Sequence, residues 1–365
     1  MIGFSLDELP TPAILVDLDV LERNVQRMAA RAKAAGVRLR PHAKTHKSVV
    51  IGAMQRAAGA AGLSLAKTSE AEVFVTAGFD DLFLAFPVVG ADKGRRLLDL
   101  SERARIAVGV DSVEGGQTLA GIFHQAGRKL DVLIKVDVGL HRVGVAPEHA
   151  LDLARAITDV PGLRLRGIFT HAGHGYLAES QDGVQKVAQD EGETLGRVAA
   201  ELRAAGIPVE EVSVGSTPTA ARAMTVPGVT ECRPGNYVFH DASQVGLGTC
   251  AIEDCALTIL ATVVSVPARD RAVVDAGSKT LSNDPLRPRA GGHGWVLGKK
   301  SRLKSLSEEH GAIDVVTGDA FRVGERVRIL PNHACVVANL HDRLLGVQGD
   351  RVEAVIDVTA RGRIE

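Results

Sequence analysis

Lys44, in the segment RPHAK at 40–44, is the residue whose position most favours chemistry in this chain. The preceding residues 37–41 alternate valine and leucine with arginine, which predicts the second strand of an α/β unit. Side chains near the carboxyl end of such a strand face the mouth where α/β proteins form their sites. A lysine amine there can form a Schiff base with a carbonyl, because apolar walls lower the pKa of the amine. A solvated surface lysine is the alternative, so Lys44 needs partners elsewhere in the chain.

The segment GSTPT at 215–219 follows the eighth predicted strand and is suited to holding a phosphate. Gly215 permits a tight turn, Ser216 and Thr217 offer hydroxyl donors, and the next helix begins with free amides. In barrels a phosphate commonly binds in the loops after strands seven and eight. An ordinary helix N-cap followed by proline is the alternative, and the presence of Lys44 favours the phosphate.

Two histidines and a tyrosine follow the seventh predicted strand in THAGHGY at 170–176. His171, His174 and Tyr176 lie among small residues, where they could contact a cofactor ring or transfer protons. Each of them could instead be a packing residue whose polar atoms are satisfied within the protein.

Two further residues could contact a cofactor. Tyr237, in PGNY at 234–237, is the other of the two tyrosines in the chain. Arg142 follows the sixth predicted strand and could pair with an anionic ring oxygen. A packing tyrosine and a surface salt bridge are the respective alternatives.

The segment PNHAC at 331–335 carries a candidate metal site. If it is a strand, His333 and Cys335 point to the same side, because side chains alternate along a strand. An imidazole and a thiolate at this spacing can bind one divalent metal and leave coordination positions open for substrate or water. A buried cysteine is more often a small hydrophobic residue, which is how Cys232, Cys250 and Cys255 are interpreted.

These candidates need a scaffold of strands and helices, and about two-thirds of the chain has that pattern. Eight strand-like runs, separated mostly by helical stretches, occur at 13–19, 37–41, 63–66, 82–85, 105–110, 130–136, 163–170 and 212–214. Repeated βα units of this number predict an α/β fold with an N-terminal (β/α)8 TIM-type barrel. A doubly wound open sheet is the alternative, but it usually has fewer strands, and no GxGxxG follows the first strand here.

The pattern of hydrophobic and polar residues changes at about residue 246, where helical periodicity fades. Short alternating runs predict strands at 256–266, 271–275, 326–330, 336–338, 343–347 and 351–358. We therefore expect a barrel domain at 13–245 and a C-terminal mostly-β domain at 246–365, which also includes about residues 1–12.

Composition excludes several functional classes. The 365 residues are 45% hydrophobic and 24% charged, which is typical of a globular chain with a large core. A formal net charge of −1 provides no electrostatic surface for nucleic acid or an anionic membrane, so neither is an expected partner. No apolar run approaches the roughly 20 residues of a membrane span, and the N-terminus lacks a signal peptide's basic region. Four cysteines without a CxxC spacing favour a reducing cytoplasm.

The motifs together resemble a known family. PHAKTHKS at 41–48, THAGHGY, GSTPT, PGNY and PNHAC occur in the order seen in D-threonine aldolases and D-serine dehydratases. These are fold-type III pyridoxal-phosphate enzymes related to alanine racemase, and the resemblance runs from about residue 11 to residue 361. It implies the barrel and the β domain, and a homodimer with its active site near the subunit interface.

The resemblance also implies roles for individual residues. Lys44 would carry pyridoxal 5'-phosphate as a Schiff base and, once released, would be a candidate base for the α-proton. His171 and His174 would be candidate bases for the substrate hydroxyl. The remaining implied cofactor contacts are Gly215, Ser216 and Thr217 at the phosphate, Tyr237 nearby, Arg142 beside the ring oxygen, and Tyr176 or His171 along the cofactor. His333 and Cys335 would bind a divalent metal, zinc or manganese, that engages the β-hydroxyl of the substrate.

Two reactions on D-3-hydroxy amino acids are consistent with this resemblance. Many aldolases of the family carry aspartate at the position of Cys335, whereas the His-x-Cys pair, GSTPT and THAGHGY are closer to the dehydratase branch. We therefore favour a lyase that converts D-serine, D-threonine or D-3-hydroxyaspartate to a 2-oxo acid and ammonia. The alternative is a D-threonine aldolase that produces glycine and acetaldehyde. An amino-acid racemase, which would not need His-x-Cys, and a non-enzymatic cofactor carrier, which would resemble the barrel alone, are weaker alternatives.

Overall fold

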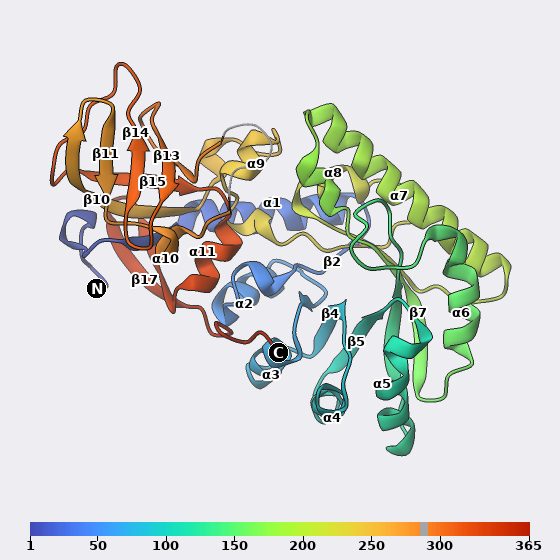
Figure 1. Cartoon of the computed structure of the whole chain (residues 1–365). Coiled ribbons are helices and arrows are strands. Elements are labelled where there is room, and N and C mark those ends of the chain that lie inside the picture. Colours follow the sequence, from blue (N-terminus) through green and yellow to red (C-terminus); the bar gives the residue numbers. More distant parts are fainter. Residues whose placement is uncertain (285–290) are drawn as a thin grey trace.

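The computed structural model describes residues 1–284 and 291–365 as a helix-covered barrel beside a strand-rich sheet (Figure 1). The barrel contains eight parallel strands in the order β2-β9-β8-β7-β6-β5-β4-β3. Their bounds are β2 Arg38–Leu39, β3 Leu63–Leu65, β4 Asp81–Pro87, β5 Arg105–Val110, β6 Leu130–Lys135, β7 Leu163–Phe169, β8 Glu211–Val214 and β9 Glu231–Cys232. The (β/α)8 barrel predicted from the sequence is therefore confirmed.

The barrel closes where the chain after β2 meets the start of β3. The amide of Ala61 donates to the carbonyl of Leu39 and that of Ser64 to the carbonyl of Pro41, both at 2.8 Å. His42, three residues after β2, forms a parallel bridge with Ser64 of β3. Closure brings the segment that carries Lys44 to the mouth of the barrel, at the carboxyl ends of the strands.

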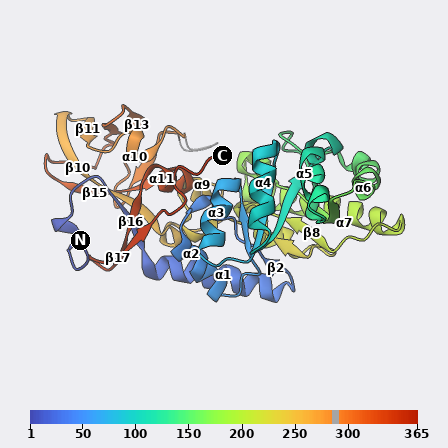
Figure 2. The same ribbon diagram turned by 90° about the horizontal axis from the view of Figure 1, so that it is seen from below.

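Helices cover the outside of the barrel, and α4, α5 and α6 follow one another along its flank (Figure 2). The helices are α1 Leu18–Ala34, α2 Val49–Ala57, α3 Thr68–Thr76, α4 Ala91–Leu100, α5 Val113–Gln125, α6 Ala150–Thr158, α7 Gln181–Ala204 and α8 Thr217–Ala223. Local signals define their ends: the Asp17 carboxylate accepts from the Val20 amide at 3.0 Å to cap α1, and Gly36 follows α1 at φ +69°.

The second sheet has nine strands in the order β11-β14-β13-β12-β15-β10-β1-β16-β17. Its strands are β1 Ala13–Asp17, β10 Leu257–Ala268, β11 Arg271–Val274, β12 Gly294–Val296, β13 Arg302–Leu306, β14 Gly311–Asp314, β15 Arg326–Pro331, β16 Arg343–Gln348 and β17 Arg351–Asp357. Three short helices accompany it, α9 Ala242–Gly246, α10 Ser278–Leu281 and α11 Ala334–Leu340.

The strand predicted at 13–19 belongs to this second sheet, so its assignment to the barrel was wrong. β1 pairs antiparallel with β10 and parallel with β16. The eighth strand of the barrel is instead β9, which pairs with β2 and β8. A two-residue strand has no readable periodicity, and a buried strand followed by a helix has the same pattern in either sheet. The count of eight was right although one member was not.

The C-terminal part departs from the predicted pattern in two further places. The strand expected at 336–338 is the middle of helix α11. Strands β12, β13 and β14 were not predicted at all. Valine at 336 and 337 suggested a strand, but β propensity is weak, and tertiary packing that buries Ala334, Val337 and Ala338 on one face of a helix overrides it.

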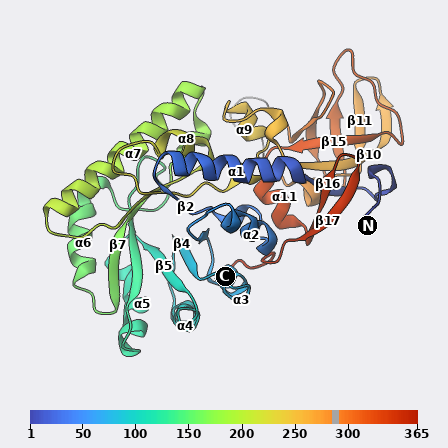
Figure 3. The same cartoon turned by 180° about the vertical axis from the view of Figure 1, so that it is seen from behind.

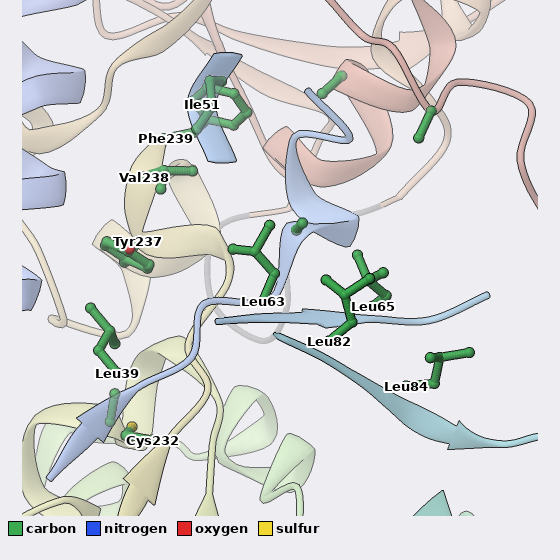
Figure 4. Close-up of a cluster of buried hydrophobic side chains, with 14 of the residues drawn as sticks. Leu39, Ile51, Leu63, Leu65, Leu82, Leu84, Cys232, Tyr237, Val238 and Phe239 are labelled. Atoms are coloured by element: carbon green, nitrogen blue, oxygen red, sulfur yellow. The ribbon is translucent and has the colours of Figure 1, made fainter. Parts of the chain in front are cut away.

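The two parts of the molecule are joined by helix α1 and by the C-terminal residues. Figure 3 shows α1 running from the second sheet to the barrel, and the chain ends beside α3. There the Lys47 ammonium donates to the carbonyl of Arg363 at 3.3 Å, and the Ser69 amide to that of Glu365 at 3.2 Å. Residues from both parts also share one continuous apolar core, part of which is drawn in Figure 4. Within the described ranges, no helix is long and apolar enough to cross a membrane.

Candidate active site

A cavity of about 490 Å³ opens at the mouth of the barrel and reaches the start of helix α11. Its lining includes most of the residues selected from the sequence. They are Lys44, Arg142, His171, Tyr176, Gly215, Ser216, Thr217, His333 and Cys335. The described lining residues include no carboxylate. They include four side chains of basic type, Lys44, Lys135, Arg142 and Arg233. The cavity is therefore electrostatically suited to a ligand with several negative charges.

Lys44 lies five residues beyond β2, in a single helical turn at Ala43–Thr45 rather than at the end of the strand. Its side chain is exposed to the open space of the cavity, and the surrounding walls reduce its contact with bulk water. This loss of bulk water lowers the pKa of Lys44, and the charges of Arg142 and Arg233 lower it further against the opposing charges of Cys335 and Glu70. A larger fraction of free amine is what a nucleophilic lysine needs.

The loop at 215–219 is held by a buried carboxylate that sequence reasoning missed. Glu191 accepts from the amide of Gly215 at 3.0 Å and from the hydroxyl of Thr219 at 2.8 Å. It also accepts from the amide of Ala172 at 3.3 Å, which joins this loop to the segment after β7. Burial raises the pKa of Glu191, and these donors oppose that shift. The hydroxyls and amides of the loop thus have a fixed arrangement beside the cavity.

A second turn, at residues 235–236, faces this loop and needs glycine. A Cβ added to Gly235 would lie 2.7 Å from the hydroxyl oxygen of Thr45 and 3.0 Å from the carbonyl of His42. The Tyr237 amide next to the turn donates to the hydroxyl of Thr217 at 3.2 Å. Hydroxyls, amides, nearby cations and a nucleophilic lysine together fit a phosphate-bearing aldehyde cofactor such as pyridoxal 5'-phosphate.

The side chain of Tyr237 does not reach the cavity. It is 1% exposed and lies in the apolar core beside Val238 and Phe239 (Figure 4). Its hydroxyl accepts from the amide nitrogen of Gln55 at 3.1 Å. The expected place for this phenol near a phosphate therefore needs correction: only the backbone of residue 237 approaches Thr217, because the helical turn Asn236–Val238 directs the ring inward.

Tyr176, by contrast, lines the cavity as expected. Burial, followed by the charges of Cys335 and Asp241, raises the pKa of Tyr176 well above its usual value against the opposing effects of Gln244 and Thr217. The phenol therefore stays protonated at neutral pH and acts as a neutral hydrogen-bonding group.

The two histidines after β7 lie in different surroundings. His171 lines the cavity, and its Nδ1 is 2.7 Å from the carbonyl of Gly215, so Nδ1 must carry the proton. Burial, Lys44 and Lys135 hold the pKa of His171 well below its usual value, which leaves Nε2 free to accept a proton. His174 lies outside the cavity lining. Its ring packs beside Gly139, where an added Cβ would be 3.3 Å from its Nε2.

Arg142 is presented by a loop that Asp137 organises. One carboxylate oxygen of Asp137 accepts from the amides of Gly139, Leu140 and His141 at 3.0–3.1 Å. These bonds lower the pKa of Asp137 against the opposing effect of burial, so the carboxylate remains charged. The loop then continues to Arg142 at the edge of the cavity.

His333 and Cys335 lie together, although the local structure is not the predicted strand. His333 is the residue before helix α11, and Cys335 lies in its first turn. The two side chains are close enough to influence each other: the charge of His333 lowers the pKa of the Cys335 thiol against the effect of burial. A helix start brings residues i and i+2 together here as a strand would have done.

His333 and Cys335 have hydrogen-bond partners from three segments of the chain. Asp284 Oδ2 is 2.8 Å from Nδ1 of His333. Cys335 Sγ lies 3.2 Å from the hydroxyl of Thr45 and 3.6 Å from the amide nitrogen of Asn236. Thr45 directly follows Lys44, so the thiol sits beside the lysine segment. In the described part of the chain no cluster of three or more His, Cys, Asp or Glu has metal-binding geometry.

Several cavity residues escaped the sequence analysis. Lys135, at the end of β6, and Arg233, just after β9, could have been found by examining the end of every strand. His42 also lines the cavity, and burial followed by the charges of Lys44 and Arg233 holds its pKa well below the usual value. Glu191, in contrast, carries no local signal, since its role depends on loops 19 and 24 residues away.

A parallel barrel with a lysine of lowered pKa at its mouth, a hydroxyl-rich loop and a second sheet that closes the site defines the alanine racemase-like class of barrel enzymes. The family model described as "Alanine racemase, N-terminal domain" matches residues 16–243, and "Putative serine dehydratase domain" matches residues 256–347. The chain belongs to this family.

Individual relatives are similar over nearly the whole chain. The D-threo-3-hydroxyaspartate dehydratase of Delftia sp. (strain HT23) is 40% identical over 351 residues, covering 91% of this chain and 92% of that protein. The crystal structure of D-threonine aldolase from Filomicrobium marinum is 34% identical, with a TM-score of 0.92, and the match covers 100% of this chain and 99% of that one.

Two solved variants of a D-threo-3-hydroxyaspartate dehydratase are also similar. One is a histidine-to-alanine variant with a TM-score of 0.91 and 38% identity, and the other is a cysteine-to-alanine variant in the metal-free form with 0.90 and 37%. Each match covers 97% of this chain, with 96% and 98% of the two variant chains. Their substituted positions are two residues apart, the same separation as His333 and Cys335.

Proposed function

We propose that this protein is a pyridoxal-phosphate- and divalent-metal-dependent lyase that dehydrates D-3-hydroxy amino acids to 2-oxo acids and ammonia. The observation that carries the proposal is the placement of Cys335 against Thr45, the neighbour of Lys44, at 3.2 Å. Lys44, suited to a carbonyl cofactor, and the His333–Cys335 pair, proposed to bind the metal, line one cavity. The name of the Delftia relative, at 40% identity, also supports dehydration.

Different residues of the cavity have different proposed roles in the reaction. When bound, the cofactor supplies an electron sink for a carbanion, and the metal supplies a Lewis acid for a hydroxyl. Lys44 would hold the cofactor aldehyde and, as a free amine, would remove the α-proton. Arg142 and Lys135 attract anionic groups into the cavity, and His333 with Cys335 would hold the metal, for which we propose zinc or manganese. Nε2 of His171 is the proposed proton acceptor on the other side of the cavity.

The cofactor phosphate is proposed to bind the Gly215–Ser216–Thr217 loop and the adjoining turn at Gly235. The support is the fixed geometry of that loop: its amide and hydroxyl groups are held by Glu191, and Thr217 is in addition bonded to the Tyr237 amide. Tyr176 and His171 are proposed to line the cofactor. His174, which lies beside Gly139 and outside the cavity lining, has weaker support as a base than His171.

Aldol cleavage is the second candidate, because a D-threonine aldolase structure matches every part of the chain with a TM-score of 0.92. The two reactions use the same contacts and differ in the bond that breaks. Dehydration loses the α-proton and the hydroxyl, whereas cleavage deprotonates the hydroxyl and breaks Cα–Cβ, leaving glycine and an aldehyde.

The test is a product assay on the holoenzyme with D-threo-3-hydroxyaspartate, D-serine and D-threonine, with and without chelator. We expect 2-oxo acid and ammonia in equal amounts, and loss of both after the metal is removed. Glycine and aldehyde as the sole products would replace dehydration by the aldolase function. Activity that survives complete metal removal would contradict the role proposed for His333 and Cys335. Lys186→Ala, at an exposed helix lysine, is the matched control for Lys44→Ala.

We also propose that the protein acts as a homodimer in a reducing compartment such as the cytoplasm. Large apolar side chains are exposed near the barrel mouth, with Phe86 43%, Val89 57% and Leu177 55% accessible, as expected of a surface that a second copy covers. The four cysteines are unpaired, which is consistent with a reducing compartment. Sedimentation equilibrium at micromolar concentration tests the dimer, and a monomeric mass would contradict it.

A further inference from the structure

A second pocket, of about 250 Å³, lies behind the 217–218 segment and away from Lys44. It is bordered by helix α1, the start of α7 and the segment that follows α9. His240, Thr249 and Asp254 are among its lining residues. Thr249 and Asp254 directly precede Cys250 and Cys255 in the chain, so the pocket lies beside the segments that carry two thiols that the proposed reaction does not use.

The two thiols belong to one small cluster. Cys255 and Cys250 both pack in an apolar cluster with Ala242 and Leu330, and each shifts the pKa of the other, as neighbouring side chains do. Cys250 is partly exposed, whereas Cys255 is only 8% exposed. The turn Ile252–Asp254 folds the intervening chain back between them. A disulfide needs two cysteines that lie close together, and the shared cluster and the turn meet that need.

Cys250 has the properties of an attacking thiol. The neighbouring Cys255 thiol and then the His240 ring lower the pKa of Cys250 to about 6 against the effect of burial. The thiol of Cys255 donates to the carbonyl of Ala251 at 3.8 Å, and Cys250 and burial raise its pKa, so it keeps its proton. The other charged groups that face the pair are the carboxylates of Asp241 and Asp254, and they oppose thiolate formation.

We propose that Cys250 and Cys255 are a modification site, a dithiol that a hydroperoxide oxidises to a disulfide. The Cys250 sulfur attacks the outer oxygen of the peroxide, the O–O bond breaks, and an alcohol or water leaves with a proton. The Cys255 sulfur then attacks the resulting sulfenic acid, the S–O bond breaks, and hydroxide leaves as water with the Cys255 proton. Two thiols lose two electrons, which reduce one peroxide.

The site is connected to the metal-binding turn. His240 directly precedes Asp241, whose carboxylate accepts from the amide of Ala334, between His333 and Cys335, at 3.0 Å. A disulfide would withdraw the Cys250 sulfur from the His240 ring and alter the support of that turn. This consequence rests on the proposed function, whereas formation of the disulfide does not.

The test is peptide mapping by mass spectrometry after the metal-loaded holoenzyme is treated with one to a few equivalents of hydrogen peroxide and its free thiols are alkylated. We expect one peptide cross-linked between residues 250 and 255, reversed by dithiothreitol, with the Cys232 peptide alkylated. Cys250→Ser and Cys255→Ser should each abolish the cross-link, and Cys232→Ser, at a buried thiol, should retain it. His240→Gln should slow the loss of thiols about tenfold.

Two results would overturn the proposal. One is oxidation of Cys335 or Cys250 to sulfinic acid with no cross-linked peptide. The other is a second divalent ion per chain that protects Cys250 and Cys255 from peroxide, since the pair would then be metal ligands. Neither readout depends on lyase activity, so failure of this proposal is distinguishable from failure of the proposed function.

Discussion

The carboxylate of Asp241 accepts a hydrogen bond from the amide of Ala334 at 3.0 Å, and the same oxygen accepts from the side-chain amide of Asn236 at 2.5 Å. Asp241 follows the barrel in sequence, whereas Ala334 lies between the two proposed metal ligands. Its other oxygen caps helix α9 through the amide of Gln244 at 3.1 Å. One buried side chain thus joins the Gly235–Asn236 turn of the cofactor site to the turn that presents His333 and Cys335.

Asp241→Asn is expected to weaken metal binding about 10–100-fold, as loss of an outer hydrogen-bond partner does in other metal sites. Asparagine has one acceptor oxygen where aspartate has two, so either the Gln244 amide or both Ala334 and Asn236 lose their acceptor. The measurement is metal content after dialysis against graded chelator. Asp319→Asn is the matched control, because Asp319 also accepts from two backbone amides, at 2.8 Å each, but lies away from the cavity. Equal metal retention in the two variants would refute this role.

Lys44→Ala is expected to abolish the visible absorbance of bound cofactor and to reduce lyase activity more than about 10³-fold. The reason is that the cavity offers no other lysine in the same turn, and Lys135 lies at the end of a different strand. Lys186→Ala should keep both properties. A Lys44→Ala protein that retains the absorbance would assign the carbonyl-binding role to Lys135.

Glu191→Leu is expected to lower the free energy of unfolding by about 2–4 kcal/mol, because three buried donors lose their acceptor. Glu191→Gln keeps one acceptor oxygen and should cost less. Both variants should also bind pyridoxal phosphate more weakly, since the 215–219 loop loses its support. Denaturant unfolding and equilibrium dialysis measure the two effects. Unchanged cofactor affinity in Glu191→Leu would mean that the loop keeps its shape without the carboxylate.

The lowered pKa of Lys135 predicts how the free energy of unfolding depends on pH. Burial, followed by the charges of Arg233, Arg142 and Lys44, lowers the pKa of Lys135 to about 7, whereas the unfolded chain has the ordinary lysine value near 10.5. Between pH 7 and 10.5 the unfolded state therefore binds more protons, so this residue makes stability rise with pH, by at most about 1.4 kcal/mol per unit. Below pH 7 its unfavourable contribution is fully present.

Lys135→Met should remove this pH dependence. In the cofactor-free protein, the variant should be more stable than the parent near pH 7, and the difference should shrink toward pH 10. Urea unfolding at several pH values provides the comparison. Parallel pH profiles for the two proteins would show that Lys135 titrates normally in the fold.

Much of the barrel was accessible from local patterns. Hydrophobic periodicity indicates the alternation of strands and helices. Most predicted strands lie within a few residues of the observed ones, as at 105–110 for β5. Motif residues such as Lys44, Ser216 and His171 were found because strand ends in barrels converge on one mouth. The periodicity of a segment reports that one face is buried, but it does not report which sheet buries it. This is why β1 was assigned to the barrel and β9 was missed.

The sequence by itself determined the class of fold, the lysine, the hydroxyl-rich loop and the His-x-Cys pair, because each is encoded in a few adjacent residues. Only the tertiary structure decided that Tyr237 turns into the core, that His174 lies outside the cavity lining, and that α11 is a helix. It also revealed Glu191 and Asp241, whose partners lie up to 93 residues away. Such contacts depend on how separate elements pack, and no local pattern records that packing.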